Sequence, residues 1–162
     1  MWDVLLIFVT IAVIILFWVI LFDTSRFVIV KHKVVDKRIS GSLRACVLAD
    51  LHNKQYGKEN ALLLQAIDEQ KPDVILIAGD IYDKSVPSAE AVQLFDGFLC
   101  ELANRHLQVF IISGNHDSPE RMSFGSRLMD QSGIHISQVY NGQIEPFAIE
   151  DEHGAVNIYM LP

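Results

Sequence analysis

The chain has 162 residues and a formal net charge of −7, and 51% of its residues are hydrophobic. A chain of this length favours one globular domain over two. An acidic protein does not bind nucleic acid through bulk positive charge, so a function based on nonspecific electrostatic binding to DNA is excluded.

The first predicted element is an apolar helix. Residues 4–22 form a run of 19 residues without a charge, between Asp3 and Asp23. A helix of about 20 apolar residues is needed to cross a bilayer. The two alternatives are a signal peptide and a buried core helix. A signal peptide would start with basic residues and end in a small-residue cleavage site. The run has neither signal-peptide feature, and it has no polar face, so we predict a transmembrane anchor over residues 1–23.

A basic connector is predicted over residues 24–42. Positive charge stays on the cytoplasmic side, which predicts a single-pass inner-membrane protein with an outward N-terminus and a cytoplasmic domain. The same charges fit contact with anionic headgroups or an ordinary solvated connector. Within this segment, the Val- and Ile-rich residues 27–35 predict an edge strand. The basic residues here and just beyond are Arg26, Lys31, Lys33, Lys37, Arg38 and Arg44.

Residues 43–162 form the predicted catalytic domain, in which short apolar strands alternate with amphipathic helices. Wholly apolar strands in this order favour an α/β fold with a parallel sheet covered on both faces. The tail from residue 134 predicts further short strands joined by turns. The strands are predicted over residues 43–49, 74–78 and 107–112, and the helices over residues 58–70 and 88–104 and from Ser118 onward.

The two cysteines, Cys46 and Cys100, lie in apolar stretches without a CxxC spacing. They predict buried free thiols in a reducing compartment. This agrees with a cytoplasmic position for the domain.

Polar residues follow the three predicted strands at the points where the strands end. Asp50 follows the first strand, Asp80 the second and Asn115 the third. The carboxyl ends of parallel strands form the ligand crevice of open α/β sheets, so these side chains should converge. His52 lies two residues after Asp50, so both can reach one ion. Each motif alone also fits ordinary turn residues, but the three in order favour a metal site.

The chemistry of these side chains suits two divalent ions. Asp80 is expected to bridge the ions, and Asn115 offers a neutral carbonyl oxygen to one of them. Mixed imidazole and carboxylate ligation favours Mn, and Fe, Zn or Mg also fit. Two ions about 3.5–4 Å apart clamp phosphoryl oxygens for an in-line displacement. His116 is then a candidate general acid or stabiliser of the leaving group, with Asp117 or another carboxylate holding its ring.

The set Asp-x-His, Gly-Asp-x-x-Asp and Gly-Asn-His-Asp resembles the calcineurin-like metallophosphoesterase superfamily over residues 43–162. The resemblance implies the N-terminal part of a four-layer α/β/β/α sandwich. It also implies a catalytic role for His116 with Asp117 beside it, and a position for Asp83 and Asp117 behind the ligands, as residues that support them. The implied metal ligands are Asp50 and His52 for one ion, Asp80 as the bridge and Asn115 for the other ion.

Two groups of relatives within the superfamily are indicated. Residues 81–162, including the run from Ser113 to Arg121, look very like the SbcD family of nuclease subunits. This implies a DNA exonuclease or endonuclease acting on phosphodiesters, with an SbcC-type ATPase as partner. Residues 1–80 are similar to membrane-anchored bacterial metallophosphoesterases, which implies the alternative of lipid-linked or nucleotide pyrophosphates as substrates.

The superfamily completes its site with a later histidine and a Gly-His-x-His element. After Asp117 the chain has only His135 and His153, and neither fits that pattern. The domain is therefore expected to be incomplete at its C-terminal end. A truncated or fused fragment without activity is the third hypothesis.

Overall fold

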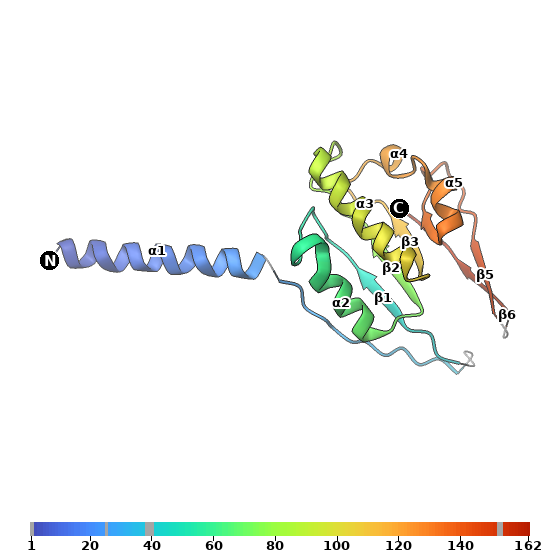
Figure 1. Ribbon diagram of the computed structural model, residues 1–162, viewed down its shortest axis with the longest axis horizontal. Helices are drawn as coiled ribbons and strands as arrows, with labels where there is room; N and C mark the ends of the chain where they lie inside the picture. The colour runs from blue at the N-terminus through green and yellow to red at the C-terminus, as the bar shows by residue number, and fades with distance from the viewer. Residues whose placement is uncertain (1, 25, 38–40, 152–153) are drawn as a thin grey trace. The chain divides into compact units, whose positions relative to one another are not determined.

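The computed structural model describes residues 2–24, 26–37, 41–151 and 154–162 (Figure 1). It divides the chain into two units, residues 1–36 and residues 37–162. Each unit is described by itself.

The first unit begins with helix α1, Trp2–Thr24. Its segment Trp2–Val19 has a mean hydropathy of 2.6, and its side chains are exposed. The helix is therefore long and apolar enough to cross a membrane. Residues 26–36 follow without regular secondary structure, so the strand predicted over residues 27–35 is wrong for the described structure. A Val-rich segment becomes a strand only when a neighbouring strand supplies backbone hydrogen bonds and a surface to pack on.

The second unit is built on a parallel sheet in the order β1-β2-β3-β4, which confirms the predicted α/β class. The strands are parallel and lie in chain order, so the chain returns across the sheet between one strand and the next. The two long helices, α2 and α3, make these returns on the same face of the sheet (Figure 1). The strands are β1 Ala45–Leu48, β2 Val74–Ala78, β3 Gln108–Ile112 and β4 Ile134–Ile136. The helices are α2 Ala61–Gln70, α3 Ala89–Asn104, α4 Pro119–Met122 and α5 Ser126–Met129, with 3-10 turns η1 Lys58–Asn60 and η2 Asp130–Ser132.

The hydrophobic core lies between this sheet and its helices. Ile75 pairs with Val109, which pairs with Ile134, and all three are buried. The start of α3 is capped locally, since the Ser88 hydroxyl accepts a hydrogen bond from the backbone N–H of Ala91.

The opposite face of the sheet is covered unevenly. Phe110 on β3 is buried against His135 and Phe147, with ring centroids 4.9 and 5.3 Å away. Phe147 starts an antiparallel pair, β5 Phe147–Asp151 with β6 Gly154–Ile158. On β1, however, Val47 is 61% exposed, so the prediction of a sheet covered on both faces is wrong at this edge strand. An edge strand has a neighbour on one side only, and the β5–β6 pair packs against the other end of the sheet.

The two cysteines differ in exposure. Both are free thiols, as predicted, and Cys46 on β1 is half-buried. Cys100 is exposed on α3, so the prediction of a buried thiol is wrong there. Only one side of an amphipathic helix faces the core, and on α3 that side includes Leu99 but not Cys100.

Candidate metal centre

The carboxyl ends of the first two strands bring three predicted ligands together. Asp50 and His52 lie in the loop after β1, and Asp80 lies in the loop after β2. One ligand atom from each of the three lies within 4.8 Å of the others. The convergence follows from the parallel order of the strands, because their carboxyl ends share one edge of the sheet.

These three residues have an unusual backbone conformation. Their φ angles are 54° at Asp50, 44° at His52 and 49° at Asp80, all in the left-handed region. Residues other than glycine rarely adopt this conformation, because it brings the Cβ atom too close to the backbone. Backbone strain of this kind is concentrated at functional sites. Two bonds between the loops hold it: the N–H of His52 donates to the carbonyl of Asp80 at 3.0 Å, and that of Asn53 donates to Ile81 at 3.1 Å.

Two glycines allow the second and third strand ends to approach. Gly79 has a φ of 80°, and a Cβ on it would lie 2.7 Å from the Cα of Gly114. A Cβ on Gly114 would in turn collide with the backbone and carboxylate of Asp80. Gly79 and Gly114 therefore allow a close backbone contact that places Asp80 beside the β3 loop. From the sequence alone, these glycines were expected only to form turns.

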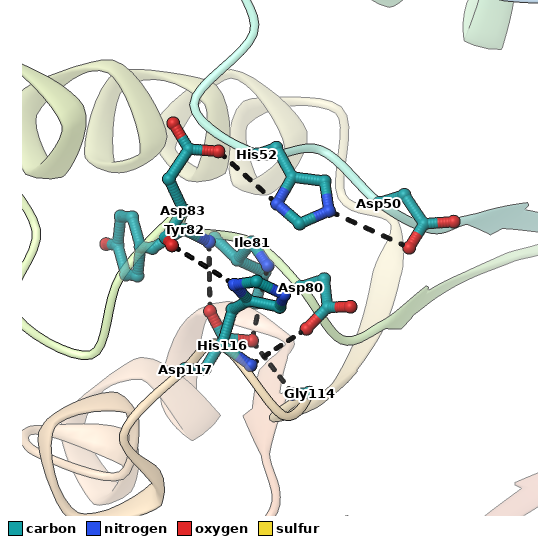
Figure 2. A network of polar contacts seen from close by, with 9 residues as sticks. All are labelled: Asp50, His52, Asp80, Ile81, Tyr82, Asp83, Gly114, His116 and Asp117. Atoms are coloured by element: carbon teal, nitrogen blue, oxygen red, sulfur yellow. Dashed lines mark hydrogen bonds and ion pairs between the residues drawn. The ribbon is translucent and has the colours of Figure 1, made fainter.

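His116 lies beside this cluster. Its backbone N–H donates to Oδ1 of Asp80 at 3.1 Å, and its ring lies 5.1 Å from that of His52 at an angle of 88° (Figure 2). The Nδ1 atom of His116 lies 3.1 Å from the backbone carbonyl of Asp83. A carbonyl only accepts, so Nδ1 carries the proton and Nε2 is the basic atom of the neutral ring. The neighbouring Asn115 is exposed in the same loop.

The carboxylate of Asp117 is bonded to backbone amides of the two neighbouring loops. It is 6% exposed, and its carboxylate accepts hydrogen bonds from three backbone N–H groups (Figure 2). The donors are Gly114 at 2.8 Å, Tyr82 at 2.9 Å and Ile81 at 3.2 Å. Asp117 or another carboxylate was expected to hold the His116 ring, whereas in the structure Nδ1 of that ring faces the backbone carbonyl of Asp83. Asp117 joins the β2 loop to the β3 loop instead.

Asp83 lies beside His52, one of the predicted ligands. Its Oδ1 lies 3.3 Å from Nδ1 of His52, and Nε2 of His52 lies 4.0 Å from Oδ1 of Asp50 (Figure 2). A carboxylate that accepts from one imidazole nitrogen leaves the other nitrogen as a metal ligand. One imidazole and two carboxylates are donors that suit Mn, Fe or Zn, so the residues present fit a divalent ion.

His135, the one later histidine among the described residues, does not belong to this cluster. His135 lies in β4, buried, with Nδ1 2.9 Å from Oδ1 of Asp130 and Nε2 2.9 Å from Oε1 of Gln108. It is part of the packing between the sheet and Phe147. His153 lies outside the described residues.

A parallel sheet with carboxylates and imidazoles at its carboxyl edge defines a metallophosphoesterase type of domain, and comparison with known proteins agrees. Residues 43–159 match the calcineurin-like phosphoesterase family, and the chain belongs to that family. It is similar to SbcD, a component of the nuclease SbcCD, from Staphylococcus saprophyticus, with 34% identity over 118 residues. The match covers 69% of this chain and 30% of that protein, so the chain spans less than a third of its relative's length. The predicted resemblance to both the superfamily and the SbcD family is confirmed.

Proposed function

We propose that the domain is a metal-dependent phosphoester hydrolase. The observation that carries the proposal is the convergence of ligand atoms from Asp50, His52 and Asp80 within 4.8 Å, with His116 beside them. Exposed acidic groups are common on proteins, but an imidazole oriented by a carboxylate, beside two strained aspartates, is the arrangement expected of a metal site. Family membership supports the same reaction class.

Each residue has a role in this proposal. Asp50, His52 and Asp80 would hold one ion, and Asp80 and Asn115 would hold a second. When bound, the ions activate water and neutralise phosphoryl charge, and Mn is the favoured metal. His116 is exposed beside Asp80. We assign it to proton transfer at the leaving oxygen, or to stabilising the charge that develops there.

The substrate we favour is a phosphodiester, with DNA as the specific case. The similarity to a component of the nuclease SbcCD supports this choice, and it extends to an SbcC-type ATPase as partner. The second candidate is a membrane-anchored phosphoesterase acting on lipid-linked or nucleotide pyrophosphates. Helix α1 favours it, as an anchor through residues 4–22 with the domain on the cytoplasmic side of the inner membrane.

A hydrolysis assay on the full chain in detergent micelles tests the reaction class. We expect Mn²⁺-dependent cleavage of bis-(p-nitrophenyl) phosphate, and its loss in Asp80→Asn and His116→Ala. The matched control is Asp96→Asn, which removes the same charge from an exposed position on α3. No cleavage by the unaltered protein, with no metal bound, would support the inactive-fragment hypothesis instead.

A comparison of substrates separates the two candidates. Duplex and single-stranded DNA and a nucleotide-diphosphate lipid are offered under the same Mn²⁺ conditions. Preferential cleavage of DNA supports the nuclease. Preferential cleavage of the pyrophosphate bond of the lipid, which gives a nucleoside monophosphate and a lipid monophosphate, rejects it in favour of the membrane phosphoesterase.

A further inference from the structure

Asn53 is linked to the candidate metal centre through its side chain. It follows His52 directly and has a left-handed backbone, with a φ of 57°. Its Nδ2 donates to Oδ2 of Asp83 at 3.0 Å, while Oδ1 of the same carboxylate lies 3.3 Å from Nδ1 of His52. The three residues thus form a chain of contacts in which the two oxygens of Asp83 are divided between an amide and an imidazole.

The amide of Asn53 is held in an orientation that is unfavourable for its own oxygen. Its Oδ1 is buried and has no hydrogen-bond partner among the described residues. Buried polar atoms are nearly always paired, so each exception needs a reason. Turning the amide over would place Oδ1 against the Asp83 carboxylate, where two acceptors repel. The contact with Asp83 therefore determines the orientation of Asn53.

Asp83 needs such a restraint. Its side chain is 54% exposed, so water competes for both of its oxygens. A carboxylate bonded at one oxygen only can rotate and expose the other to solvent. A second bond, from Asn53, restricts that rotation and keeps Oδ1 directed at His52.

We propose that Asn53 is a positioning residue for the metal centre. By fixing the Asp83 carboxylate, it holds His52 with the proton on Nδ1, facing Oδ1 of Asp83, and leaves the lone pair of Nε2 available to an ion. The role deepens the proposed function and rests on it. The backbone N–H of Asn53 donates to Ile81 independently of the side chain, so the side chain is not needed for that link between the loops.

The variant Asn53→Gly separates the two functions of this residue. Glycine adopts the left-handed backbone without strain and keeps the N–H bond to Ile81, but it lacks the amide. Asn60→Gly is a matched control, because Asn60 also has a left-handed φ of 62° and is buried. Its Oδ1 accepts from the backbone N–H of Tyr56 at 2.9 Å and not from the metal centre.

Two measurements on the full chain in detergent micelles test the proposal. Mn²⁺ binding, followed by the loss of the free-ion EPR signal, should weaken by about 10- to 100-fold in Asn53→Gly, as for other residues that orient ligands. The ¹⁵N shifts of His52 in the metal-free protein should change from those of a single Nδ1–H tautomer to those of a mixture. Asn60→Gly should lower the melting temperature and leave both readouts unchanged.

The outcomes distinguish this proposal from the function it rests on. Mn²⁺ affinity within twofold of the unaltered protein, together with an unchanged His52 tautomer, would overturn the role of Asn53. Failure of the unaltered protein to bind Mn²⁺ would reject the metal site, while the tautomer in the metal-free protein would still decide the role of Asn53. If Asn53→Gly does not fold, Asn53→Asp keeps the size and backbone preference and replaces the donor with an acceptor, so the same tautomer change is expected.

Discussion

Replacing Asp117 with alanine should remove much of the stability of the domain. The carboxylate is buried and accepts three backbone hydrogen bonds, of 2.8, 2.9 and 3.2 Å. A hydrogen bond to a charged group contributes about 1.5–3 kcal/mol. Because the longest bond counts least and some water enters the space left by the side chain, we expect a loss of about 3–6 kcal/mol of unfolding free energy. That is a large part of the roughly 5–15 kcal/mol typical of a domain.

The variant Asp117→Asn gives a graded test of the same reasoning. Its carbonyl oxygen can replace Oδ2, which accepts from Ile81 and Gly114. Its amino group then faces the N–H of Tyr82, so one bond and the charge are lost. We expect a loss of about 1–3 kcal/mol, between the unaltered protein and the alanine variant.

Denaturation by guanidinium chloride in detergent micelles measures both losses, and hydrogen exchange locates them. The amides of Ile81, Tyr82 and Gly114 should lose protection in the alanine variant. The control Asp96→Asn removes a charge from an exposed position and should change stability by less than about 0.5 kcal/mol. A loss below about 1 kcal/mol for Asp117→Ala, or unchanged protection of the three amides, would show that Asp117 does not join the loops.

Three other changes test separate features. Gly79→Ala should lower the free energy of unfolding by about 2–4 kcal/mol in the same denaturation assay. The new Cβ would be strained by the left-handed backbone and would collide with Gly114. A loss below about 1 kcal/mol would contradict the close contact. Iodoacetamide at pH 8 should modify exposed Cys100 before half-buried Cys46, and mass spectrometry follows the two reactions. Burial also raises the pKa of Cys46, which slows its reaction. The reverse order of modification would contradict the difference in exposure between the two thiols. Burial, and then the negative charges of two neighbouring aspartates, raise the pKa of Tyr82. Its contribution to stability is therefore present below the unfolded pKa of about 10 and is lost as the pH rises through the folded pKa. In alkaline denaturation Tyr82→Phe should lose stability less steeply above about pH 10, and an identical slope would contradict the shift.

The sheet and the position of its polar edge could be predicted from local patterns. Apolar runs of strand length end at Asp50 and Asp80, and the alternation with helices implies parallel strands. Parallel strands necessarily place their carboxyl ends at one edge, so the approach of these two carboxylates needed no knowledge of tertiary contacts. His52 followed because it lies two residues from Asp50.

The supporting contacts could not be predicted in this way. The carboxylate of Asp117 bonds a backbone N–H 36 residues away, and Asn53 bonds Asp83 across 30 residues. Such pairings depend on the relative placement of loops, which no periodicity encodes. A carboxylate that follows a histidine in the sequence was assigned to that histidine, whereas the fold directs it to three backbone amides. The uncovered side of β1 was missed for the same reason, because burial depends on what packs against a strand and not on its own composition.

The geometry indicates that the fold itself holds the candidate metal centre in place. Asp50, His52 and Asp80 each have a left-handed backbone, at a cost of about 1–3 kcal/mol for each residue. Glycine would remove that strain but also remove the donor atoms. Opposing the strain are two backbone bonds between the loops and the three amide bonds to Asp117, which together contribute about 4–9 kcal/mol. Because these bonds are made by the chain itself, folding contributes directly to bringing the ligand atoms together.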